Sequence, residues 1–114
     1  MGKTTSYERG YKFELRVRKH LEKEGWWVIR SAQSRGLADL AAFWPGIAVN
    51  VGSDSEYLFP GQVMLIACRT DKARFSLQER QGLKNLARHL GHEAWLAHRA
   101  PGKGTRHHLY LEEL

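Results

Sequence analysis

Residues 63–70 read Val63-Met64-Leu65-Ile66-Ala67-Cys68-Arg69-Thr70, and they indicate how the rest of the chain is arranged. From Val63 to Cys68 the side chains are almost all apolar, without the alternation of apolar and polar residues that a half-exposed strand shows. An unbroken apolar run of this length indicates a strand that is covered on both faces, in the middle of a sheet. The remaining sequence therefore has to supply neighbouring strands on both sides and helices for both faces.

Two amphipathic helices are predicted, one on either side of this strand in the sequence. Thr5-x-x-Glu8 and Ser76-x-x-Glu79 are capping boxes, which mark helix N-termini. The first opens a helix over Ser6–Glu24, and the second opens a helix that ends near Gly91. The apolar stripes predicted to face the sheet are Phe13, Val17 and Leu21 in the first helix and Leu83, Leu86, Ala87 and Leu90 in the second.

Strand-like segments fill most of the remaining chain. They are Trp26–Arg30, Asp39–Trp44, Val63–Cys68, Glu93–Ala97 and Leu109–Leu111. Residues Gly46–Gly61 contain turn residues at both ends and predict an excursion from the sheet, in the form of an added hairpin. The order α-β-β-excursion-β-α-β-β predicts an α/β fold in which helices flank a mixed sheet, as one domain over residues 1–114.

The charge and the cysteine content restrict the partners and the compartment. Eighteen Lys and Arg against 12 Asp and Glu give a net charge of +6, which favours a polyanionic partner such as nucleic acid. No apolar run is long enough to cross a membrane, and the N-terminal residues do not form a secretory signal. A single cysteine, Cys68, excludes an internal disulfide and favours the reducing cytoplasm.

Three motifs, taken in order, carry a resemblance to a known family. They are Glu14 in the first helix, Ser34-Arg35-Gly36-Leu37-Ala38-Asp39 before a strand, and Leu65-Ile66-Ala67-Cys68-Arg69 within the central strand. From Gly10 to Arg99 the chain resembles the archaeal-type Holliday junction resolvases, in the PD-(D/E)xK nuclease superfamily. The resemblance implies a restriction-endonuclease-like sheet and a homodimeric, Mg²⁺-dependent endonuclease that resolves four-way DNA junctions by paired nicks.

The resemblance also implies a role for each motif residue. Glu14 and Asp39 would hold Mg²⁺, with Mn²⁺ as a substitute, and Cys68 would add its backbone carbonyl. These oxygen donors suit a hard cation that activates water and neutralises charge on the phosphate. Ser34 would contact the phosphate near the cut. Arg69 stands where the family has lysine and would assist at the phosphate.

Ala67 departs from the family pattern because it stands where the family has glutamate. A methyl group cannot bind a metal, and Arg69 has too high a pKa to serve as a general base. Three explanations stay open. The ligand has moved elsewhere, the site works with fewer protein ligands, or the chain is inactive, either naturally or through deliberate replacement of glutamate. The positions to which the ligand could have moved are Asp71, Asp54, Glu56 and Glu79, with Asp71 favoured by strand alternation.

Basic residues near the motifs are the predicted phosphate contacts. They are Arg18, Arg30, Arg35, Lys72 and Arg74. Arg9, Lys12, Arg16, Lys19 and Lys23 form a separate basic stripe on the first helix, which is interpreted first as a solvated face and second as a contact to a remote DNA arm. Leu15 and the Trp26-Trp27 pair indicate a subunit interface for a homodimer.

Two functional hypotheses follow. The first is a Mg²⁺-dependent endodeoxyribonuclease that resolves branched DNA. The second is a module of the same fold that binds junction DNA without cleaving it, because catalysis is lost at Ala67. A different substrate for the same fold, such as a flap or a damaged duplex, remains a third possibility.

Overall fold

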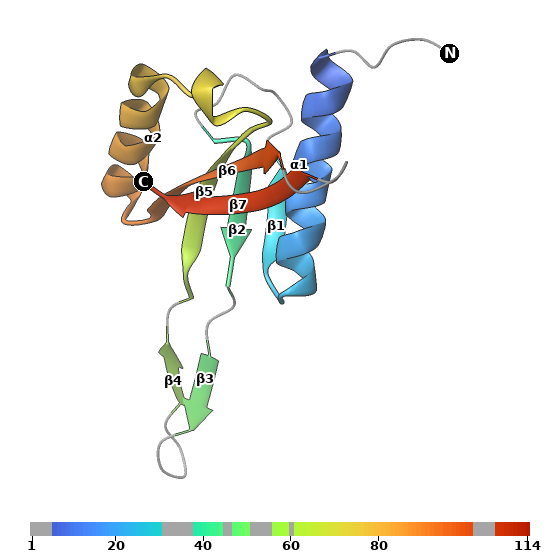
Figure 1. Cartoon of the computed structure of the whole chain (residues 1–114). Coiled ribbons are helices and arrows are strands. Elements are labelled where there is room, and N and C mark those ends of the chain that lie inside the picture. The colour runs from blue at the N-terminus through green and yellow to red at the C-terminus, as the bar shows by residue number, and fades with distance from the viewer. Residues whose placement is uncertain (1–5, 31–37, 45–46, 51–55, 60, 102–106) are drawn as a thin grey trace.

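The computed structural model of the chain describes residues 6–30, 38–44, 47–50, 56–59, 61–101 and 107–114. The two helices and the strands confirm the predicted α/β class (Figure 1). In chain order the elements are α1 (Ser6–Lys23), β1 (Trp27–Arg30), β2 (Leu40–Phe43), β3 (Ile47–Asn50), β4 (Glu56–Phe59), β5 (Val63–Arg69), the 3₁₀ turn η1 (Lys72–Arg74), α2 (Leu77–Leu90), β6 (Glu93–Pro101) and β7 (His107–Glu113).

The main sheet has five strands in the order β1-β2-β5-β6-β7. The apolar strand β5 is its middle member, as its unbroken apolar sequence predicts. Strands β5 and β6 are parallel and are joined through α2, whereas all other neighbours in this sheet are antiparallel. The predicted excursion is a hairpin, because β3 and β4 pair with each other in a sheet of their own (Figure 1).

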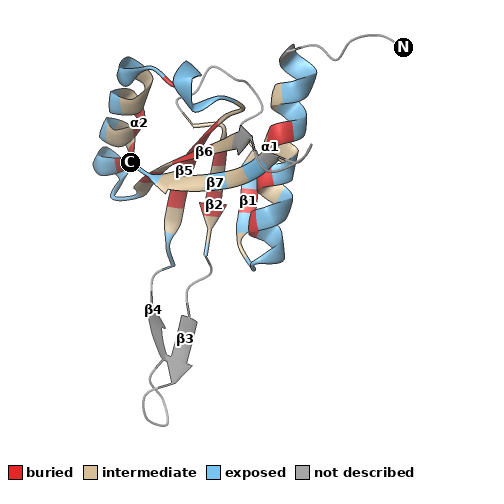
Figure 2. Cartoon of the chain, in the orientation of Figure 1, coloured by how far each residue is buried: buried red, intermediate tan, exposed pale blue. Residues whose placement is uncertain are grey.

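The side chains of β5 alternate between two hydrophobic cores, one under each helix. Met64, Ile66 and Cys68 belong to the core under α1, and Leu65 and Ala67 belong to the core under α2. Figure 2 shows buried residues concentrated on β5, on β2 and on the side of α1 that faces the sheet. The helix residues that complete the cores are Phe13, Val17 and Leu21 of α1 and Leu83 and Ala87 of α2. Burial on both faces of β5 is the reason that its sequence is apolar throughout.

Helix α2 begins and ends at the residues that the sequence predicts. The Oγ of Ser76 accepts a hydrogen bond from the Glu79 N–H at 3.0 Å, and Glu79 accepts one in return from the Ser76 N–H at 3.4 Å. Gly91 ends the helix in the left-handed region with φ of 75°, which glycine adopts without steric cost. Leu90 was predicted on the apolar face, but it is 50% exposed because it lies in the last turn. Among the described helices, none has the length and apolar character of a membrane span.

Strand β6 is longer than its local sequence predicts. The prediction ended at Ala97, whereas the strand continues to Pro101. Its second half pairs with β7 in an antiparallel ladder that extends to the Pro101–His107 pair. The outer position predicted for the last strand is confirmed, since β7 lies at the edge of the sheet.

The two adjacent tryptophans at the start of β1 lie in different environments. Trp26 packs against the α1 core, and its ring lies 5.3 Å from the ring of Trp44. Trp27 is 68% exposed on β1, which forms the other edge of the sheet. Ile29, two residues further along the same strand, is 48% exposed. The predicted subunit interface at Trp26-Trp27 therefore depends on Trp27, because Trp26 contributes to the core.

Candidate functional site

Asp39 is held at the carboxyl end of β5. It lies immediately before β2, and its backbone N–H donates to the Ile66 carbonyl at 2.8 Å. Its carboxylate oxygen Oδ2 accepts a hydrogen bond from the Cys68 N–H at 2.7 Å. The side chain is only 12% exposed. Asp39 is therefore fixed beside the Cys68–Arg69 segment, where the sequence motifs predict it.

Arg69, the last residue of β5, lies at the centre of the charged site. Its Nη1 donates to Oδ2 of Asp39 at 2.9 Å and to the Cys68 carbonyl at 2.8 Å. Its Nη2 donates to Oε2 of Glu79, in the first turn of α2, at 2.5 Å. The guanidinium also lies 5.5 Å from the centre of the Phe75 ring. We call Asp39, Arg69 and Glu79 the Arg69 triad.

The pKa values in the triad reflect these contacts. The hydrogen bond from Arg69 lowers the pKa of Glu79 below its ordinary value of 4.5, although partial burial opposes that shift. Burial lowers the pKa of Arg69, but the contacts with Glu79 and Asp39 more than offset this, so the pKa is raised above its ordinary value. Glu79 and Arg69 are therefore both charged at neutral pH.

The arrangement of oxygen donors in the triad does not fit Mg²⁺. The two oxygens that the resemblance assigns to the metal, Oδ2 of Asp39 and the Cys68 carbonyl, both accept from the same nitrogen of Arg69. A guanidinium has no lone pair to offer and keeps its positive charge, so it repels a cation at that position. Within the described residues, the His, Cys, Asp and Glu side chains form no group of three that could hold a metal ion.

Ala67 cannot contribute to such a site, and its surroundings explain its size. It is fully buried in the core under α2. The neighbours in that core are apolar, among them Leu65, Phe75 and Leu83. A small apolar residue suits this position, whereas a carboxylate would need a charged or hydrogen-bonding partner in the same space.

Glu14 forms a separate ion pair. Its Oε2 accepts from the Nε of Arg30 at 2.8 Å, and the Arg30 guanidinium lies 4.8 Å above the centre of the Tyr11 ring. This hydrogen bond is the main cause of the raised pKa of Arg30. The Glu14 side chain is 16% exposed, as expected for a residue at the edge of the buried stripe of α1.

Cys68 has a thiol whose pKa depends on both Asp39 and Glu14. Burial raises the pKa of Cys68 well above its ordinary value, and the negative charges of Asp39 and Glu14 raise it further. Each of the two carboxylates binds a different arginine, Glu14 to Arg30 and Asp39 to Arg69. Cys68 is a buried core residue, as predicted.

The proposed positions for a relocated ligand have different outcomes. The strand alternation that favoured Asp71 does not apply, because β5 ends at Arg69. The carboxylate of Asp71 instead caps η1 by accepting from the Ala73 N–H at 3.0 Å. Glu79 is brought to Asp39 through their shared arginine. Asp54 and the side chain of Glu56 lie outside the described part of the chain.

Two of the predicted phosphate contacts form ion pairs with glutamates. Arg18 pairs with Glu22 at 3.1 Å, and Lys72 pairs with Glu112 at 2.9 Å. The contact with Lys72 is the main cause of a lowered pKa of Glu112. Ser34 and Arg35 lie outside the described residues.

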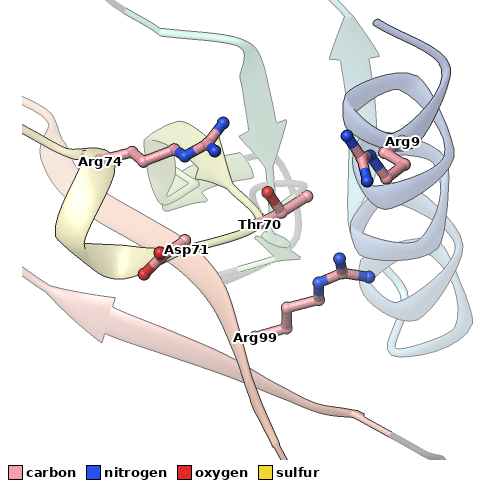
Figure 3. A pocket seen from close by; sticks show the side chains of 5 residues that line it. All are labelled: Arg9, Thr70, Asp71, Arg74 and Arg99. Carbon is pink, nitrogen blue, oxygen red and sulfur yellow. The ribbon is translucent and has the colours of Figure 1, made fainter. Parts of the chain in front are cut away.

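Arg74, unlike Arg18 and Lys72, lines a cavity. With Arg9, Thr70, Asp71 and Arg99 it lines a polar cavity of about 230 Å³, which we call the arginine pocket (Figure 3). Sequence reasoning did not predict Arg99 as a phosphate contact. No local motif marks it, and it reaches the pocket only because β6 runs parallel to β5.

No protein-family model, curated protein or solved structure matches this chain. The resemblance to the junction resolvases therefore rests on the motifs quoted from the sequence.

Proposed function

We propose that this chain is a DNA-binding module with a restriction-endonuclease-like fold, which binds branched DNA and does not cleave it. One observation carries the proposal: a single nitrogen of Arg69 donates to both Asp39 Oδ2 and the Cys68 carbonyl. In this proposal the guanidinium takes the place that a divalent cation has in a cleaving relative. Arg69 satisfies the charge of Asp39 but cannot activate a water molecule as a metal ion does.

The surroundings of the triad support binding without cleavage. Ala67 provides no oxygen ligand and is fully buried among apolar side chains. The net charge of +6 favours attraction to the DNA backbone. Two copies of the chain, joined through the exposed edge strand β1, would present two such surfaces to a two-fold symmetric junction.

A second candidate function is the Mg²⁺-dependent junction resolvase that the motif order implies. The observation that favours it is Glu79, one of the four positions proposed for a relocated ligand. Its Oε2 lies 2.5 Å from Arg69, the same guanidinium that binds Asp39. The two candidates differ in whether Arg69 stays between the two carboxylates when DNA is bound.

The deciding experiment measures binding and cleavage of a labelled four-way junction on the same samples, with Mg²⁺ and with Mn²⁺. We expect tight binding to the junction, weaker binding to a linear duplex at the same salt concentration, and no nicks. Paired symmetric nicks that disappear in Asp39→Asn would overturn the proposal and establish the resolvase. Equal affinity for junction and duplex would contradict both candidates.

A gain-of-function variant tests whether the residues at positions 67 and 69 are the reason that the chain does not cleave DNA. The double change Ala67→Glu with Arg69→Lys restores the residue types of the family motif, and we expect it to introduce cleavage. Because Ala67 is fully buried, folding of this variant is checked first by circular dichroism. Arg69→Lys alone serves as the second variant if the double variant is unfolded, and on the proposal it binds the junction without cutting. A folded double variant that binds the junction and still does not cut it contradicts the assigned role of Ala67.

A further inference from the structure

The arginine pocket is built from four separate segments that meet at the carboxyl end of β5. Arg9 comes from the first turns of α1, Thr70 and Asp71 follow β5, Arg74 belongs to η1, and Arg99 lies on β6. The β5–β6 ladder ends at the Arg69–His98 pair, so Thr70 and Arg99 are the next residues on the two parallel strands. Figure 3 shows the side chains of Arg9 and Arg99 extending toward the same space from α1 and β6.

The charge of this cavity suits an anion. Among the described residues that line it, three carry guanidinium groups and one, Asp71, carries a carboxylate. That carboxylate is turned away from the arginines in Figure 3, and its Oδ1 accepts from the Ala73 N–H of η1. These described lining residues carry more positive than negative charge, and the half-buried Thr70 adds a hydroxyl group. Guanidinium groups bind phosphate oxygens through paired hydrogen bonds with matching geometry.

The shape of the cavity distinguishes between two kinds of phosphate. A phosphate inside a nucleic-acid strand carries one negative charge and two free oxygens, and surfaces that follow a strand form extended grooves. A terminal phosphate monoester has three acceptor oxygens and a charge of about −1.5 to −2. Three arginines from three different elements line one concave space of about 230 Å³, which suits a terminal group better than a continuous backbone.

We infer that the arginine pocket binds the terminal phosphate monoester of a nucleic-acid strand. The inference rests on the proposed function for the presence of DNA and adds to it that the branched DNA has a strand end. The pocket lies next to the Arg69 triad in the chain, because Thr70 directly follows Arg69.

The test uses a four-way junction with one nick, in three forms: a 5′-phosphate at the nick, a 3′-phosphate at the nick, and no phosphate. Affinities are measured by fluorescence anisotropy at one salt concentration for the wild-type chain, Arg74→Ala, Arg99→Ala and the control Arg88→Ala. Arg88 is an exposed arginine on α2 that does not line the pocket, so its loss removes the same charge elsewhere.

We expect the wild-type chain to bind one phosphorylated form about tenfold more tightly than the form without phosphate. Arg74→Ala and Arg99→Ala should lose this preference, and Arg88→Ala should keep it. The end that is preferred, 5′ or 3′, identifies the source of the phosphate. Equal affinity for all three forms overturns the inference, as does an equal loss of preference in Arg88→Ala and Arg99→Ala.

Two further samples separate this inference from the proposed function. Binding of the intact junction with no preference for phosphate would support the proposed function and refute the inference that the arginine pocket binds a terminal phosphate. In the opposite case, a phosphorylated single strand would bind through Arg74 and Arg99, and the intact junction would not bind. That result would support phosphate binding in the arginine pocket and refute junction binding as the proposed function. Titration of the wild-type chain with inorganic phosphate, followed by the side-chain N–H signals of these two arginines in NMR spectra, should shift both; unshifted signals contradict the inference.

Discussion

Replacing Arg69 by methionine tests whether the Arg69 triad stabilises the fold. Methionine keeps an apolar stem at this position and removes the guanidinium, whose central carbon lies 5.5 Å from the centre of the Phe75 ring. Three hydrogen bonds are lost, to Asp39, to Glu79 and to the Cys68 carbonyl. The two carboxylates then lose the positive charge between them, so the variant should be less stable at neutral pH.

The expected loss in the free energy of unfolding depends on how exposed the three side chains are. Asp39 is 12% exposed, Arg69 28% and Glu79 40%, so the triad lies between a buried and a surface ion pair. Breaking a buried pair costs about 3–5 kcal/mol, and exposed pairs contribute about 0–1 kcal/mol. Asp39 also keeps its hydrogen bond from the Cys68 N–H. We therefore expect a loss of about 2–3 kcal/mol in the free energy of unfolding, which corresponds to a decrease in Tm of about 8–12 °C for a chain of this size.

The pH dependence gives an independent check. The pKa of Glu79 is lowered in the folded state, so its contribution to stability is present above its unfolded value of 4.5 and is lost as the pH falls through the folded value. This contribution depends on Arg69. The difference in stability between the wild-type chain and Arg69→Met should therefore decrease as the pH is lowered below about 4.5.

Urea unfolding monitored by circular dichroism measures the loss of stability and its dependence on pH. Urea is chosen because it does not screen charges. Arg88→Met is the matched control on the exposed surface of α2 and should change stability by less than about 0.5 kcal/mol. If Arg69→Met unfolds at the same urea concentration as the wild-type chain at pH 7, the triad does not stabilise the fold. A stability difference that stays constant on acidification would refute the assigned role of Glu79.

Three further predictions concern other parts of the molecule. Leu83→Ala should lower the free energy of unfolding by about 2–5 kcal/mol, measured by urea unfolding, because the side chain is fully buried under α2. Ser76→Ala should cost about 1 kcal/mol in the same assay, since it removes the hydroxyl of the capping box, and Ser76→Gly should cost only a few tenths. Cys68 should react with a thiol reagent at pH 8 far more slowly in the folded chain than in urea, because burial and Asp39 raise its pKa; equal rates would show that the thiol is accessible.

Sequence patterns predicted the architecture where a local property determines structure. The apolar run of β5 predicted a central strand because burial on both faces leaves no position for a polar residue. The limits of α2 followed from Ser76 and Gly91, whose hydrogen bonds lie within a few residues. The length of β6 did not follow from its sequence, since its second half is a strand through pairing with β7.

The candidate site was only partly predictable for the same reason. Asp39 lies beside Cys68, as the motif order implies. The contact between Arg69 and Glu79 depends on how α2 packs against β5, which no spacing in the sequence specifies. The cluster of Arg9, Arg74 and Arg99 depends on three elements meeting at one end of the sheet.

The β3–β4 hairpin has a consequence for how this fold can be altered. The ladder between β2 and β5 continues to Trp44 and Gln62, where the Trp44 N–H donates to the Gln62 carbonyl at 2.8 Å. Residues 45–61 thus connect two positions that directly face each other in an antiparallel pair. A two-residue turn such as Asn-Gly closes a gap of that kind. The segment is therefore interchangeable: a short turn or a foreign hairpin grafted between Trp44 and Gln62 would leave the register of the five-stranded sheet unchanged.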